Sequence, residues 1–315
     1  NKFKTKILFI ADEVHATGSA KQRDALLPEY DYRIGLSATP ERMFDEGGTS
    51  LIRNYFGDKS FEFTIADALS TINPLTGRSF LNHFTYHPIF VELTPSENKL
   101  FNKYSQQIAI LKAQDEYDPD DLQKLYDRRA AVSKNAEGKY EALNRLLGKL
   151  NPERIVDTIL FVSDKQIKKS FDILSDRHIK RAKITEQEST SKIVNNSGDT
   201  ERQEIISQFN HRQLQVLVGI KCLDEGIDIP NARIAILMSN STNPREFIQR
   251  VGRVIRQAEG KQLSEIYDFI ATSDSVDGLL KKESQRAQLI AVNADNYKEV
   301  KEAFSQRGVN LDANQ

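Results

Sequence analysis

Between residues 151 and 271, short apolar segments alternate with helical stretches, and this alternation constrains the fold more than any other feature of the sequence. Strands are predicted at 155–162, 182–185, 215–220, 232–238 and 264–270. Helices are predicted at 164–175, 200–210 and 244–256. Strands that alternate with helices of this length are typical of βαβ units, in which helices cover both faces of a parallel sheet. Residues 151–271 are therefore predicted to form an α/β domain.

A second α/β unit is predicted at the start of the chain. The apolar segments 6–11 and 33–38 both run into small polar residues, which is typical of buried parallel strands that open onto loops. A third strand is predicted at 88–93, and the sequence before it is rich in glycine and proline, which interrupt regular structure. We place the end of this first domain near residue 93, so that it covers residues 1–93.

A helical insertion is predicted between the two units, over residues 94–150. Thr94 fits the N-cap of a capping box, with Pro95 in the first turn and Glu97 reaching back to the cap. Apolar side chains then recur every three to four residues in three successive stretches, which predicts three helices. The polar tail at 272–315 is also expected to be helical.

Composition excludes several classes of protein. Charged residues make up 28% of the chain and hydrophobic residues 39%, as in ordinary globular proteins. No segment approaches the ~20 apolar residues that a bilayer crossing requires, so no membrane partner is expected. The single cysteine, Cys222, cannot form an internal disulfide, and a cytoplasmic location is expected. Because 44 basic and 45 acidic side chains nearly cancel, a nucleic-acid site would have to be a local patch.

The first predicted strand runs directly into Asp12, Glu13, Val14 and His15. Sheets of this class place ligand-binding groups at the carboxyl ends of their strands, and in nucleotide hydrolases such a carboxylate holds Mg²⁺. Glu13 could then orient and polarise an attacking water. The same residues also fit a solvated loop, so this motif alone leaves both interpretations open.

Three arginines lie at positions 250, 253 and 256, within the last predicted helix. At this spacing their side chains would point to roughly one side of a helix. One interpretation is a solvated basic stripe. The other is that Arg253 and Arg256 reach the γ-phosphate of a nucleotide, as arginine fingers do. Further upstream, Gly226 would allow a ligand to approach the backbone closely.

Five motifs, taken in order, resemble those of superfamily 2 helicases. They are DEVH at 12–15, SATP at 37–40, FVSD at 161–164, DEGIDIP at 224–230 and QRVGRVIRQ at 249–257. The most similar branch is the DEAH-like group of restriction-enzyme helicase subunits, repair helicases and double-strand translocases. The resemblance covers about residues 4–271. It implies two RecA-like domains, the first incomplete, with ATP in the cleft between them and nucleic acid across both.

The resemblance also implies a role for each matched residue. Asp12 would bind Mg²⁺ through water, and Glu13 would be the catalytic carboxylate. Coupling of the ATP state to domain closure would fall to His15, Ser37 and Thr39. In the second domain, Asp228 would face the nucleotide and Gly226 would lie near ATP or the nucleic-acid strand. Gln249 would meet the phosphates or His15, and Arg253 and Arg256 would be the arginine fingers. The residues near the nucleic acid would be Ser163 and Lys221, although Lys221 equally fits a solvent-facing lysine.

One motif of the family is absent from the sequence. A phosphate-binding loop needs G-x-x-x-x-G-K-S/T, and none of the Gly-Lys pairs at 138, 148 and 260 fits it. We therefore expect residues 1–315 to be the carboxyl-terminal part of a longer ATP-dependent motor and to be inactive alone. Its partner would be nucleic acid, duplex or forked DNA rather than RNA, together with restriction or repair subunits. The alternatives are a non-catalytic RecA-like scaffold that binds nucleic acid or a partner, and a motor split between two polypeptides.

Overall fold

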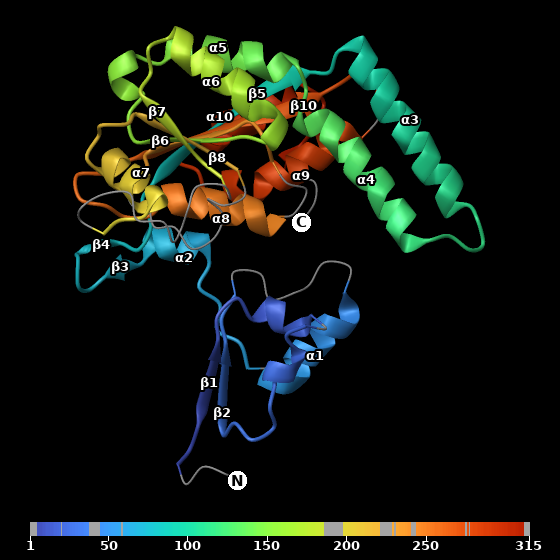
Figure 1. Ribbon diagram of the computed structural model, residues 1–315, viewed down its shortest axis with the longest axis vertical. Coiled ribbons are helices and arrows are strands. Elements are labelled where there is room, and N and C mark those ends of the chain that lie inside the picture. Colours follow the sequence, from blue (N-terminus) through green and yellow to red (C-terminus); the bar gives the residue numbers. More distant parts are fainter. Residues whose placement is uncertain are drawn as a thin grey trace. The chain divides into compact units, whose positions relative to one another are not determined.

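The computed structural model shows an α/β chain in two compact units, Asn1–Phe63 and Thr64–Gln315 (Figure 1). The residues that the structure describes are 5–19, 21–37, 45–57, 59–185, 198–220, 229, 231–240, 244–274, 276 and 278–311. Within these residues, no helix is both long enough and apolar enough to cross a membrane.

The first unit is built on two parallel strands, β1 (Leu8–Ala11) and β2 (Tyr32–Gly35). Short 3₁₀ helices at Val14–Gly18 and Arg23–Ala25 connect the strands, and helix α1 (Glu46–Phe56) follows β2. A small core forms where Ala11 and Val14 meet Ile52 of α1. The two parallel strands predicted at the start of the chain are therefore confirmed.

The opposite face of the β1–β2 pair is apolar and exposed. Leu8 lies beside Tyr32 and Ile10 beside Ile34, and these four side chains are between 46% and 55% exposed. Alternate residues of a strand point to opposite faces, so this face is distinct from the one that packs on α1. One face of the β1–β2 pair is thus covered by α1. The other, formed by Leu8, Ile10, Tyr32 and Ile34, is exposed and is called the bare face below.

The second unit contains a six-stranded sheet in the order β5-β10-β9-β6-β8-β7, in which every neighbouring pair is parallel. The strands are β5 (Phe84–Glu92), β6 (Thr158–Phe161), β7 (Arg181–Ile184), β8 (Val216–Gly219), β9 (Ile234–Leu237) and β10 (Ser264–Thr272). All residues of β6, β8 and β9 are buried, as expected of central parallel strands. The predicted parallel sheet is confirmed.

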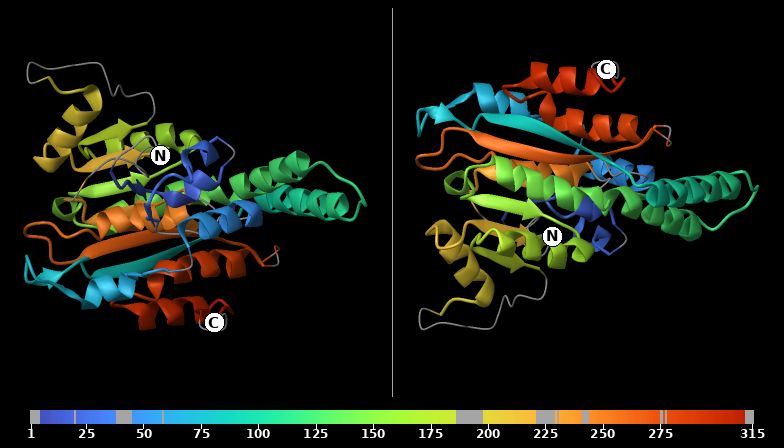
Figure 2. Two further views of the ribbon diagram at one scale, coloured as in Figure 1. Left: turned by 90° about the horizontal axis from the view of Figure 1, so that it is seen from below. Right: turned by 90° about the horizontal axis from the view of Figure 1, so that it is seen from above.

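Helices cover both faces of this sheet (Figure 2). One face packs against α7 (Glu201–Asn210), α8 (Pro244–Val254), α9 (Leu279–Ala291) and α10 (Tyr297–Ser305). The other packs against α5 (Gly138–Lys149) and α6 (Ile167–Asp176). A short helix, α2 (Ile65–Ser70), and a two-stranded hairpin, β3 (Ile72–Asn73) and β4 (Arg78–Ser79), precede β5.

A helical hairpin of α3 (Pro95–Lys112) and α4 (Pro119–Lys134) projects from the sheet (Figure 1). The capping box predicted at its start is present, because Glu97 N donates to Thr94 Oγ1 while Thr94 N donates to Glu97 Oε2 at 2.9 Å. The three helices predicted over 94–150 are confirmed. Only two of them project, since the third, α5, packs on the sheet.

Two expected boundaries differ from the structure. The first domain was predicted to extend to residue 93, but the first unit ends at Phe63, because all nine residues of β5 pair with β10 in the second unit. The described part of the tail at 272–315 is helical over α9 and α10, as predicted. It belongs to the core, however, since Ala287 and Ile290 of α9 and Phe304 of α10 are fully buried.

Candidate nucleotide site

The carboxylates of the DEVH motif lie directly after β1. Glu13 has φ 49° and ψ 50°, a left-handed conformation that costs a residue with a side chain about 1 kcal/mol. Its amide donates to Asp12 Oδ1 at 2.9 Å, and its own carboxylate oxygen Oε2 lies 3.2 Å from His15 Nδ1. The tight turn therefore fixes the Glu13 carboxylate against the imidazole of His15, while Asp12 stays exposed.

The two motifs of the first unit meet through His15 and Ser37. His15 Nδ1 lies 3.4 Å from Ser37 Oγ, and the backbone supports this approach because Val14 N donates to Leu36 O at 2.8 Å. The structure thus brings one residue of the DEVH motif and one of the SATP motif together. Thr39 lies outside the described residues.

The donor set of the DEVH turn suits Mg²⁺. Hard carboxylate oxygens are its preferred protein ligands, and the ion is commonly held by one or two carboxylates together with water and substrate phosphates. Asp12 supplies such a carboxylate. No group of three or more histidine, cysteine, aspartate or glutamate side chains that could enclose a metal occurs within the described part of the chain.

Helix α8 carries the arginine motif, and its first arginine is an anchor. Arg250 is only 3% exposed, and its Nη1 donates to the carbonyl oxygen of Ser239, just after β9, at 2.5 Å. Its guanidinium carbon lies 5.4 Å from the ring centroid of Phe161, and Nη2 lies 3.7 Å from Glu246 Oε2. Arg250 therefore fastens α8 to the carboxyl ends of β6 and β9.

The other two arginines do not share one helical face. Arg253 lies on α8 with Gln249, and Arg253 is 8% exposed. Helix α8 ends at Val254, so the exposed Arg256 lies beyond it, in an isolated antiparallel bridge with Leu81. The expectation of three arginines along one helix is wrong for Arg256, because Asn82 N donates to Ile255 O at 2.7 Å and draws the backbone toward β5.

A buried lysine, Lys261, caps the carboxyl end of α8. Lys261 Nζ donates to the carbonyl oxygens of Val254 and of Arg256, the latter at 2.8 Å. Burial, together with the smaller effect of the charge of Arg233, lowers the pKa of Lys261 to about 7. The sequence gives no signal for this role, since Lys261 follows Gly260 in a pair that matches no motif. It fixes the backbone from which the Arg256 side chain extends.

Gly252 stands inside α8 without a steric reason in the described structure. Apart from the backbone of α8 itself, a methyl group added there would meet no atom of the described residues within 4 Å. Glycine in a helix interior costs about 1 kcal/mol relative to alanine. Among the described residues, the space over Gly252 is open.

Ser163 lies where the sheet meets the base of the hairpin. It is 8% exposed, and its Oγ donates to Asn135 Oδ1 at 2.5 Å. Nearby, Gln166 Nε2 donates to the carbonyl oxygen of Lys134 at 3.0 Å. The hydroxyl of Ser163 therefore joins α4 to β6, and this engagement does not favour the nucleic-acid contact expected of it. Lys221, Gly226 and Asp228 lie outside the described residues.

Comparisons with known proteins agree with the motifs. Residues 138–258 match the family described as "Helicase conserved C-terminal domain". A "DNA 3'-5' translocase XPB2" from Sulfurisphaera tokodaii is 27% identical over 283 residues, which cover 84% of this chain and 58% of that protein. The "DNA repair and recombination protein RAD54" of Saccharomyces cerevisiae is 25% identical over 70% of this chain and 28% of its own length. Residues 138–258 are thus a superfamily 2 helicase C-terminal domain.

A solved structure, the helicase domain of Hef from Pyrococcus furiosus, aligns with 84% of this chain and 70% of its own. Its TM-score is 0.43 at 15% identity. The chain spans 58% and 43% of the lengths of two of its curated relatives.

Proposed function

We propose that this protein is an ATP-dependent DNA helicase or translocase of superfamily 2. The observation that carries the proposal is the arrangement of Glu13, His15 and Ser37. A left-handed turn after a parallel strand holds the carboxylate 3.2 Å from the imidazole, which in turn lies 3.4 Å from the hydroxyl. A carboxylate in this position suits a general base that orients water. Its contact with His15, which lies beside Ser37, links it to groups that could respond to domain closure.

In this proposal residues of both units contribute to ATP hydrolysis. Asp12 holds Mg²⁺ through water, and Glu13 orients and polarises the attacking water. Gln249 and Asp228 bind the nucleotide, and Gly226 allows its close approach. Arg253 and Arg256 stabilise the charge that develops on the γ-phosphate, which is the role of arginine fingers in nucleotide hydrolases. Thr39 couples the nucleotide state to domain closure, together with His15 and Ser37.

The nucleic acid in the proposal is DNA, duplex or forked. The names of two relatives support this choice, because one is a DNA translocase and the other a DNA repair and recombination protein. Lys221 would supply a point charge to a phosphate of the strand. Restriction or repair subunits are the proposed partners, and the cytoplasm the proposed location.

The bare face of β1 and β2 supports a larger first lobe. Leu8, Ile10, Tyr32 and Ile34 form a contiguous apolar surface of the kind that proteins cover with further structure or with a partner. We propose that both lobes are RecA-like and that the first needs additional strands and helices to be complete. The phosphate-binding loop, which the sequence does not contain, would belong to that additional structure.

The test is phosphate release stimulated by duplex DNA, measured on a protein extended upstream to include a phosphate-binding loop. Glu13→Gln should abolish release, and Arg253→Ala or Arg256→Ala should lower it at least about a hundredfold while DNA affinity changes little. Glu29→Gln, at an exposed position away from the motif, is the matched control. Equal turnover in wild type and Glu13→Gln would contradict the proposal.

The chain 1–315 provides a second arm of the same test. Because it lacks the phosphate-binding loop, it should release no phosphate by itself, with or without DNA. DNA-stimulated release by this chain that Glu13→Gln removes would overturn the expectation that it is inactive alone. DNA binding that no nucleotide alters, in the extended protein as well, would favour the scaffold alternative.

A further inference from the structure

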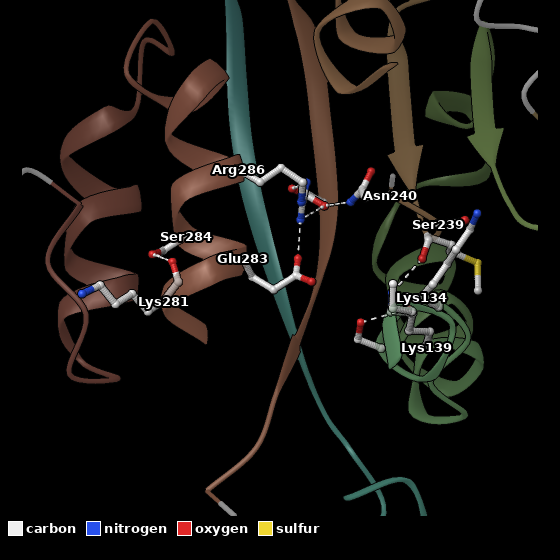
Figure 3. Close-up of polar contacts among 12 residues, drawn as sticks. Lys134, Lys139, Ser239, Asn240, Lys281, Glu283, Ser284 and Arg286 are labelled. Atoms are coloured by element: carbon white, nitrogen blue, oxygen red, sulfur yellow. Dashed lines mark hydrogen bonds and ion pairs between the residues drawn. The ribbon is translucent and has the colours of Figure 1, made fainter. Parts of the chain in front are cut away.

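A buried carboxylate, Asp268 in β10, joins three other elements of the second unit. It accepts hydrogen bonds from Tyr86 of β5, from Asn240 just after β9, and from Arg286 of α9. Arg286 Nη1 lies 2.7 Å from Asp268 Oδ2, and Nη2 also donates to Glu283 Oε2 at 2.8 Å. Figure 3 shows Arg286, Glu283 and Asn240 converging from α9 and from the end of β9.

The same guanidinium reaches the arginine helix. The guanidinium carbon of Arg286 lies 4.7 Å from the ring centroid of Phe247, which is 1% exposed in α8. Phe247 lies two residues before Gln249 and six before Arg253 on the same helix. Because a guanidinium presents a planar face, two hydrogen bonds to Asp268 fix both its position and the direction of that face. Arg286 therefore presents a fixed planar group that packs against Phe247 in the first half of α8.

The network also holds the strand that leads into α8. Asn240 is the last described residue after β9, and α8 begins at Pro244. Asn240 Nδ2 donates to Asp268 Oδ1, and Arg286 Nη2 donates to the same oxygen. Asn240, which follows β9, is thus bound directly to Asp268. The first part of α8 contacts Asp268 indirectly, because Phe247 stacks on the guanidinium of Arg286.

We propose that Arg286 is a positioning residue for the nucleotide site, acting through Phe247 on the placement of Gln249 and Arg253. This inference rests on the proposed function. Arginine fingers and phosphate-binding glutamines act only when they are held in one geometry, and displacements of about 1 Å can lower turnover by two orders of magnitude. None of the five helicase motifs lies in α9. The positioning role of Arg286 would therefore belong to the part of the chain that follows the motifs.

Two variants probe the contact from its two sides. Arg286→Lys keeps a positive charge beside Asp268 but loses the planar stack and the paired hydrogen bonds. Phe247→Leu keeps the ion pair and removes the aromatic ring. The matched control is Arg307→Met, because Arg307 of the tail also stacks on a phenylalanine, Phe90, at 3.8 Å, and that contact includes no residue of α8.

Two readouts separate positioning from general stability. In the extended protein, Arg286→Lys and Phe247→Leu should each lower kcat roughly tenfold with KM for ATP within about twofold, and the double variant should be no worse than the poorer single one. In ¹⁵N-labelled chain 1–315, both variants should shift the amide signals of Gln249 and Arg253. Arg307→Met should change neither readout.

The inference is overturned if Gln249 and Arg253 keep their wild-type amide signals in both variants, or if kcat is unchanged. The amide comparison needs no ATP turnover. A wild-type protein that hydrolyses no ATP would therefore contradict the proposed function, and the amide signals would still decide whether Arg286 places α8.

Discussion

Lys139 Nζ donates to the carbonyl oxygen of Met238 at 2.9 Å and to that of Lys134 at 3.2 Å. Lys139 lies in the first turn of α5, Met238 directly follows β9 and Lys134 ends α4, so one ammonium group joins the base of the projecting hairpin to the carboxyl edge of the sheet (Figure 3). The lysine is 3% exposed, and burial lowers its pKa to about 8. The hairpin and the sheet are thus joined through a titratable group.

This burial predicts a pH dependence of stability. In the unfolded chain the pKa of Lys139 returns to 10.5, so between pH 8 and 10.5 the unfolded state binds more protons than the folded state. The free energy of unfolding should therefore rise with pH through this window. Lys139→Met should reduce the slope by up to about 1.4 kcal/mol per pH unit, measured by urea denaturation from pH 8 to 9.5. Lys124→Met, at an exposed lysine, should keep the wild-type slope, and an unchanged slope in Lys139→Met would contradict this account.

Arg250 and Arg256 should differ sharply in their effect on stability. Arg250→Met leaves Glu246 and the carbonyl oxygen of Ser239 without the cation that they face, and removing one partner of a buried ion pair costs about 3 kcal/mol. Arg256→Met changes an exposed side chain and should shift the free energy of unfolding by less than about 0.5 kcal/mol. Urea denaturation of the two variants tests this. Similar losses in both would show that Arg250 is not the anchor of α8.

Local periodicity predicted the strands and helices between residues 94 and 271, because the burial pattern of each is visible within a few residues. It did not predict α2 or the hairpin of β3 and β4. It could not predict that β5 pairs with β10, since those strands are separated by more than 170 residues and parallel pairing leaves no local signal. The same limit applies to the site. His15 and Ser37 stand in recognisable motifs, whereas Lys261 and Arg286 act on α8 through contacts that only the folded chain brings together.

Two helical glycines, Gly138 at the start of α5 and Gly252 inside α8, should respond oppositely to alanine. A methyl group at Gly138 would lie 2.9 Å from Val91 Cγ1, so Gly138→Ala should lower the free energy of unfolding by about 1–2 kcal/mol. At Gly252 no atom of the described residues outside the backbone of α8 lies within 4 Å of the added methyl group. Gly252→Ala should therefore raise the free energy of unfolding by up to about 1 kcal/mol through better helix propensity. Thermal denaturation measures both. If the space over Gly252 receives the nucleotide, the stabilised variant should still lose ATP turnover in the extended protein.

The bare face of β1 and β2 predicts how the chain 1–315 behaves in solution. Ile34 is 46% exposed on that face, whereas Ile52 is 5% exposed on the covered side. Ile34→Lys should therefore leave the thermal midpoint of the first unit nearly unchanged, while it lowers binding of the dye ANS and slows aggregation, because it interrupts the apolar surface. Ile52→Lys should unfold the unit, since it buries an unpaired charge. In the extended protein, where we propose that further structure covers the face, Ile34→Lys should instead be strongly destabilising. Equal tolerance of Ile34→Lys in both proteins would show that the face stays open and that the first lobe gains no cover there.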